Sequence, residues 1–208
     1  MATKAAEEAS LEVHYIGELE VGWEFPALES NEGLFVDYSA DAGSEWLPIA
    51  RKEGFVGQTQ TSYADAGGVY VFNHPIDFHF IADSLDRWPR LHVQVFKLDA
   101  AGRVETVSYG SVNLPSMSGH SEITCRTWRP LNMSTFDEAR AAHAVGGDAG
   151  MLPAGRADIL DGRVPEVRSK MVTKTSGTVC LSLDTVLRNA GKHGILLPHR
   201  ASGGAGSK

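Results

Sequence analysis

Apolar and polar side chains alternate along several stretches of this chain. The clearest examples are residues 76–80, 91–95 and 179–183, where every second side chain is apolar. Successive side chains of a β-strand point to opposite faces, so a period of two predicts strands that bury one face only. Strands of this kind are typical of antiparallel sheets.

Turn-forming residues separate these stretches into short strands. Ser176-Gly177 lies between 168–175 and 178–187 and predicts a hairpin that joins the last two strands. Many short strands at this spacing favour a sandwich or a barrel. Before the hairpin, we expect strands near 11–19, 33–40, 45–51, 68–73, 76–82, 90–98, 107–114 and 121–128.

One segment departs from the alternation. Residues 134–143 begin with the capping residue Ser134, continue with good helix formers, and end before Gly146-Gly147. These features predict a short helix inside an insertion at 132–167. We expect one domain at 10–195, with disordered tails at 1–9 and, because it is rich in glycine and serine, at 196–208.

Composition narrows the functional class. The chain has 208 residues and a formal net charge of -7, which argues against nucleic-acid binding and against an electrostatic grip on anionic lipid. Cys125 and Cys180 are the only cysteines, so a disulfide framework is not expected and a reducing compartment is favoured. No apolar run approaches roughly 18 residues and the first residues lack a signal sequence, so we expect a soluble intracellular protein.

Eight short motifs occur in an order and spacing that resemble the B9 domain family. One of them is Trp88-Pro89-Arg90, and another is Thr127-Trp128-Arg129-Pro130. The resemblance extends over about residues 11–195. The motifs lie at 12–19, 57–60, 74–80, 88–96, 109–110, 114–115, 127–131 and 187–189.

The resemblance implies an all-β fold, a C2-like antiparallel β-sandwich with a short helical insertion. It also implies a non-catalytic scaffold of the Meckel–tectonic complex, which supports ciliogenesis and the ciliary gate. The implied location is the cytoplasm at the base of the cilium, in the transition zone or basal body. The implied partners are two paralogous B9-domain proteins, including the Meckel syndrome type 1 protein, with any membrane contact made through the complex.

The resemblance also bears on calcium. It aligns 95–99 with the segment where calcium-binding C2 domains carry two aspartates, but here Lys97 stands at the first position and only Asp99 remains. Ca²⁺ requires six to eight oxygen ligands, and an ammonium group repels it. We therefore expect no calcium site and no other cofactor.

Histidines offer a second candidate metal site. His74, His79 and His92, with Asp77, would converge only if their strands paired, since a metal needs three or four ligands. Solvated or hydrogen-bonded imidazoles are the favoured alternative. The sequence lacks the nucleophile elbow, the His-Glu-x-x-His motif and the phosphate-binding loop, so it does not predict an enzyme.

Candidate partner contacts lie at predicted strand ends. Trp88 and Trp128 either pack on the sheets or anchor an interface, a use enriched in tryptophan and arginine. The candidates are Trp88, Arg90, Trp128, Arg129, Gln58 and Gln60. The alternative function is a peripheral phospholipid-binding module, which would need a basic patch formed by Lys97, Arg103, Lys192 and Arg200.

Overall fold

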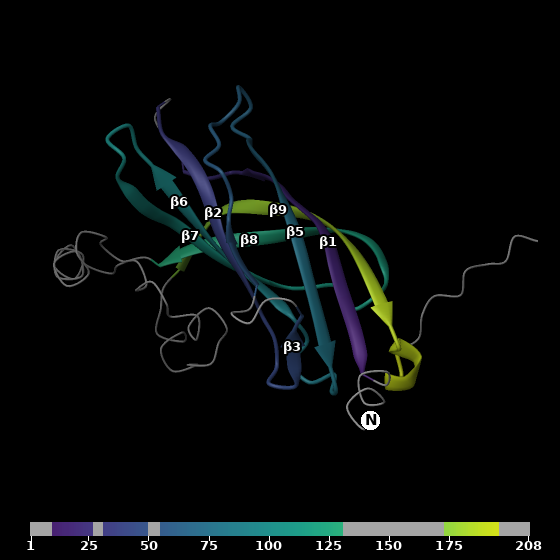
Figure 1. Cartoon of the computed structure of the whole chain (residues 1–208). Helices are drawn as coiled ribbons and strands as arrows, with labels where there is room; N and C mark the ends of the chain where they lie inside the picture. The colour runs from purple at the N-terminus through teal and green to yellow at the C-terminus, as the bar shows by residue number, and fades with distance from the viewer. Residues whose placement is uncertain (1–9, 27–30, 50–54, 131–172, 196–208) are drawn as a thin grey trace, which may run out of the picture.

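The computed structural model describes residues 10–26, 31–49, 55–130 and 173–195 (Figure 1). Within these ranges the regular structure is almost entirely β, which confirms the all-β fold class. The described elements are β1 (Leu11–Trp23), β2 (Gly33–Asp41), β3 (Trp46–Pro48), β4 (Phe55–Gln58), β5 (Tyr70–Ala82), β6 (Arg90–Leu98), β7 (Val104–Asn113), β8 (Gly119–Pro130), β9 (Thr173–Arg188) and the 3-10 helix η1 (Ala190–His193).

Neighbouring strands are antiparallel and follow the order β3-β5-β1-β9-β8-β7-β6-β2-β4. β7 and β8 meet at the Tyr109–Trp128 pair, where the hydrogen-bonded sheet passes from one layer to the other. The first layer contains β3, β5, β1, β9 and β8, and the second contains β7, β6, β2 and β4 (Figure 1). The molecule is therefore an antiparallel sandwich.

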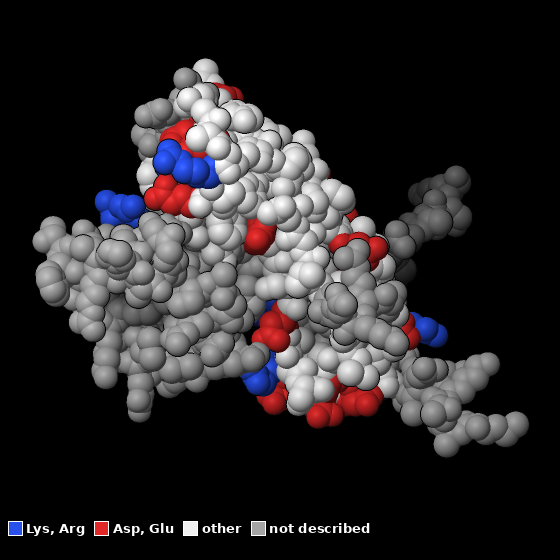
Figure 2. All heavy atoms as spheres, turned by 60° about the vertical axis from the view of Figure 1, so that its left-hand side comes forward, with Lys and Arg blue, Asp and Glu red and all other residues white. Residues whose placement is uncertain are grey.

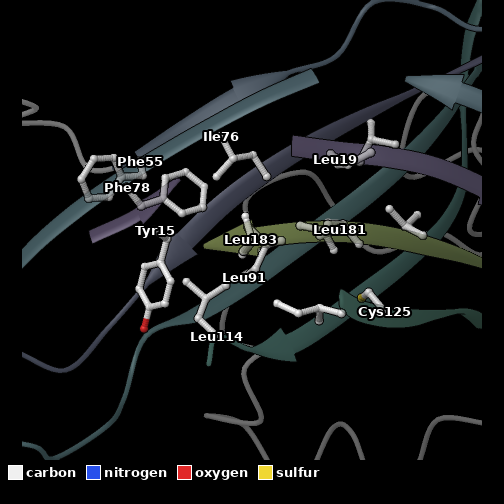
Figure 3. Close-up of a cluster of buried hydrophobic side chains, with 14 of the residues drawn as sticks. Tyr15, Leu19, Phe55, Ile76, Phe78, Leu91, Leu114, Cys125, Leu181 and Leu183 are labelled. Carbon is white, nitrogen blue, oxygen red and sulfur yellow. The ribbon is translucent and has the colours of Figure 1, made fainter. Parts of the chain in front are cut away.

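The core lies between the two layers and is made by the alternating apolar positions. Tyr15 of β1 and Leu181 and Leu183 of β9 are fully buried, and they face Leu91 of β6 and Leu114 from the other side (Figure 3). Each fully buried aliphatic side chain contributes roughly 1.5–3 kcal/mol through removal from water. The period of two is what places these side chains on the inner faces.

Ser176-Gly177 does not form the predicted hairpin turn. β9 is one continuous strand, in which these two residues lie opposite the single residue Thr127 and make a β-bulge. Gly177 has φ 85°, and a Cβ there would meet the ring of Phe25. The Thr127 hydroxyl donates to the carbonyl of Ser176 and lies 2.9 Å from the Ser108 hydroxyl. A positive φ occurs in tight turns and in β-bulges. The Ser-Gly pair therefore correctly indicated an unusual backbone conformation, but the predicted hairpin turn was wrong.

The strands expected at 68–73 and 76–82 are also one element, β5. Asn73, with φ 43°, lies where the pairing with β1 shifts register between Leu19 and Val21. β3 pairs with β5 only at 80–82, so this edge of β5 is not paired with β3 at Pro75. Proline has no backbone N–H to donate and is tolerated at such an edge. β5 therefore continues through His74-Pro75, where the sequence predicted a gap between two strands.

Other differences concern short edge strands. Residues 46–48 of the strand expected at 45–51 form β3, and β4 was not among the eight strands expected before the hairpin. β4 pairs with β2 from Ala40–Phe55 to Asp37–Gln58. The expected helix at 134–143, its insertion and both tails lie outside the described residues. Among the described helices, none has the length and apolar character needed to cross a bilayer.

Candidate partner-binding site

A pocket of about 430 Å³ opens at one end of the sandwich, where β2 and β7 end and β6 begins. Trp88 and Arg90 both line it, together with Asp41, Arg87 and Asn113. The structure therefore brings two of the six predicted contact residues into one site. The ends of three strands of the second layer meet there with the turns before β6 and after β7, which explains why no single sequence motif contains the whole pocket.

Trp88 serves the core and the pocket at once. Its ring packs edge-to-face on Trp46, with ring centroids 4.9 Å apart and planes at 76°. Trp46 is held in turn by a 2.9 Å hydrogen bond from Nε1 to the carbonyl of Asp86. Burial raises the pKa of nearby Tyr15, whose hydroxyl donates a 3.0 Å hydrogen bond to the carbonyl of Pro115. Trp88 is therefore partly buried against the core, and its use as an interface anchor stays a prediction.

Arg90 is held in the middle of a polar row across three strands. It lies opposite Asp41 of β2 on one side and Asn113 of β7 on the other. Its Nε donates a 2.9 Å hydrogen bond to Asn113 Oδ1. A guanidinium fixed beside a half-buried tryptophan is suited to holding a partner's polar side chain in a defined orientation.

Gln58 and Gln60 make contacts inside the protein. Gln58 hydrogen-bonds to Asp37, whose pKa is raised by burial and lowered again by this bond. The amide of Gln60 donates to the carbonyl of Phe72 in β5, so it links the two layers. Both residues remain exposed at their outer ends. Their described contacts are structural, and the sequence did not indicate them.

Trp128 and Arg129 lie apart from the pocket. The Trp128 ring packs on Tyr109, with centroids 5.6 Å apart. One row crosses the second layer and continues onto β8 of the first, so that Gln58 and Trp128 lie at its two ends. The row is Gln58, Asp37, Gln94, Tyr109 and Trp128. Arg129 pairs in register with Lys174. The six candidates therefore form separate groups.

The loop segment compared with calcium sites is occupied by ion pairs. Lys97 Nζ lies 2.9 Å from Glu105 Oε2 and 3.2 Å from Glu32 Oε1, and these contacts, that with Glu105 first, raise its pKa. Asp99 Oδ1 accepts the N–H groups of Ala101 and Arg103, and its Oδ2 lies 2.6 Å from Arg103 Nε. Arg103 in this way lowers the pKa of Asp99.

These pairs also bear on the predicted basic patch. Lys97 and Arg103 each face carboxylates, and Arg200 lies outside the described residues. On the face shown in Figure 2, the basic side chains form small groups beside acidic ones, separated by uncharged surface. This arrangement leaves little local positive field for an anionic bilayer.

The histidines considered as a candidate metal site do not converge. His92 lies in β6 of the second layer, and His74 Nε2 lies 3.0 Å from the Tyr38 hydroxyl. His79 instead stacks on His14, with ring centroids 4.6 Å apart, and His14 Nε2 lies 2.6 Å from Asp77 Oδ1. Within the described part of the chain, no group of His, Cys, Asp and Glu is arranged to hold a metal ion. The alternation in 11–19 could have identified His14 as an outward residue.

We expect acidification to destabilise the fold through His79. Burial and the neighbouring His14 lower its pKa, against the opposing effects of Glu12 and Asp77. The unfolded state then binds more protons as pH falls below about 6.5, so stability is lost on going from about pH 7 to about pH 5. Urea unfolding of the wild type and of His79→Gln checks this, and the variant should show a weaker pH dependence. Equal slopes would contradict it.

The chain is similar to known proteins over most of its length. Residues 13–186 match the model of a family described as "B9-C2: Ciliary basal body-associated, B9 protein". The chain is 33% identical to B9 domain-containing protein 2 of Homo sapiens over 184 residues, which cover 88% of this chain and 98% of that protein. The Drosophila melanogaster protein of the same name is 27% identical over 185 residues, covering 88% and 97%.

Two further matches are more limited. Human "Tectonic-like complex member MKS1" is 34% identical over 76 residues, which cover 33% of this chain and 14% of that protein. Among solved structures, the C2A domain of a plant extended synaptotagmin 1 matches with a TM-score of 0.42 and 14% identity, covering 86% of this chain and 95% of that one.

Proposed function

Because this chain belongs to the ciliary basal body-associated B9 protein family, we propose that it is a non-catalytic scaffold subunit at the base of the cilium. The observation that carries the proposal is the family match, which spans 13–186 and so covers nearly all of the described sandwich. In this role the chain assembles with two paralogous B9-domain proteins in the Meckel–tectonic-like complex of the transition zone. The match to part of human MKS1 supports a partner of that kind.

The end pocket supports the scaffold role. Tryptophan and arginine are both enriched among the residues that contribute most binding energy at protein interfaces. Trp88 is braced by Trp46, and Arg90 by Asn113, so both are already ordered before a partner arrives. Ordering in the free protein lowers the entropic cost of association. We assign Trp88 and Arg90 to partner binding on this ground.

Calcium has no part in this proposal. The Lys97 ammonium forms ion pairs with the carboxylates of Glu32 and Glu105, so its positive charge occupies the place that a calcium ion would need. Calorimetric titration of the purified chain with CaCl₂ should give no heat of binding in the sub-millimolar range. A sub-millimolar site would overturn this part of the proposal.

Co-expression with the two other B9-domain proteins tests the function. The three full chains should purify as one stable complex, and a tagged chain in ciliated cells should collect at the ciliary base. Arg90→Ala should weaken the complex, while Arg103→Ala is the matched control, since it also removes one guanidinium that bonds a neighbouring side chain. A monomeric chain that stays away from cilia would refute the proposal.

A further inference from the structure

The outer face of the first layer, formed by β5, β1, β9 and β8, is a broad surface with a distinct charge. Strand register places its side chains in rows, such as Asp77–Ile16–Asp184–His120 and Pro75–Glu18–Ser182–Glu122. Carboxylates prevail over the two arginines of this face, Arg126 and Arg188. The acidic residues of the face are Glu12, Glu18, Glu20, Asp77, Glu122 and Asp184.

Apolar side chains are exposed at the centre of this face. Ile16 of β1 is 46% exposed and Val186 of β9 is 56% exposed. Val186 pairs with His14, two residues from Ile16, so the two apolar side chains are diagonal neighbours within reach of a common partner group. Ile16 itself lies between Asp77 and Asp184. The face thus has a small apolar centre, with Asp77 and Asp184 on either side of Ile16 and His14 beside Val186.

Part of the negative charge is balanced within the face and part is not. Arg188 Nη1 lies 2.9 Å from Glu12 Oε1, and His120 Nδ1 lies 3.3 Å from Asp184 Oδ1. Glu18, Glu20 and Glu122 make no ion pair with any other described residue. Burial, and after it the carboxylates of Glu20 and Glu122, raise the pKa of the Cys180 thiol on the same face.

We propose that this face docks a protein partner that presents basic side chains around an apolar centre. Complementary charge steers association and selects the partner, and burial of Ile16 and Val186 supplies apolar contact at the middle of the interface. An anionic bilayer would be repelled by the same carboxylates. The inference rests on the proposed scaffold function and names the second surface, besides the end pocket, through which the chain joins its complex.

Charge reversal on the full chain, co-expressed with the other two B9-domain proteins, tests the docking face. Glu18→Lys with Glu122→Lys breaks no described ion pair and should lower partner recovery at least about tenfold. The matched control is Glu24→Lys with Glu105→Lys, two exposed acidic residues outside the face and away from the end pocket, which should leave recovery unchanged. Val186→Asp, which keeps the face acidic but removes its apolar centre, should also reduce recovery.

Each outcome has a defined meaning. Loss confined to the face variants, with circular dichroism and melting temperature like those of wild type, supports the inference. Should those variants not fold, the wild-type complex must still weaken between about 0.1 and about 1 M salt, since salt screens exposed charges. Equal recovery of all variants, or a salt-insensitive complex, overturns the docking face alone. A homodimer disrupted by the variants would also overturn it, because the occupant would be a second copy. A wild type that recovers no partner overturns the scaffold function as well.

Discussion

Replacing Leu183 with alanine is expected to lower the free energy of unfolding by about 2–5 kcal/mol, the range for removing a fully buried leucine. Leu183 is 0% exposed and projects from β9 into the space between the layers, beside Leu91 and Tyr15 (Figure 3). Both layers contribute to its surroundings, so neither can move in to fill the cavity without disturbing the other. Urea unfolding followed by tryptophan fluorescence measures the loss.

Val186→Ala is the matched control for this change. Val186 lies three residues further along the same strand but is 56% exposed, so its truncation should change stability by no more than about 0.5 kcal/mol. If both variants lost similar stability, the inward direction of Leu183 and the assignment of the two faces of β9 would be wrong.

Gly17→Ala should cost about 3 kcal/mol, the upper end for overpacking, because the added methyl group has no space. A Cβ at Gly17 would meet backbone atoms of Ser182 and Leu183 in the neighbouring strand β9. These are main-chain atoms, so relief requires β1 and β9 to separate, and their pairing holds the middle of the first layer. The same unfolding measurement, or the yield of soluble protein, reports the effect.

Gly191→Ala tests whether the effect is one of space. No heavy atom lies within 4 Å of a Cβ built at Gly191, so this change should be nearly neutral. Comparable destabilisation by both substitutions would point to the general loss of glycine, and would refute the close approach of β1 and β9.

The period of two predicted most strands well, but the continuity of strands was missed twice. At Ser176-Gly177 and at His74-Pro75 the local residues favour a break, and in both places the strand continues through a bulge or an open edge. Glycine and proline favour backbone conformations that interrupt regular strand pairing, and these conformations occur both in turns and in bulges. Whether the chain turns or continues as a strand depends on the neighbouring strand. Thr127 of β8 lies opposite the bulge in β9, and β3 does not pair with β5 at Pro75.

The candidate site was predicted residue by residue but not as a set. Trp88 and Arg90 meet in one pocket, while Gln58 and Gln60 bond to Asp37 and Phe72 inside the protein. His79 stacks on His14, a residue that was not among the histidines considered as a candidate metal site. Each of these partnerships joins residues distant in the chain, which is why spacing along the sequence could not reveal them.

The sequence alone determined the class of the fold, which side chains enter the core, the likeness to the B9 family and the lack of familiar catalytic motifs. Alternation and motif order are local properties, readable without knowing which strands are neighbours. Tertiary structure decided the strand order, the bulges, the end pocket and the row register that places Ile16 among carboxylates. Register depends on contacts between distant segments, and a slip of one residue would turn the acidic face inward.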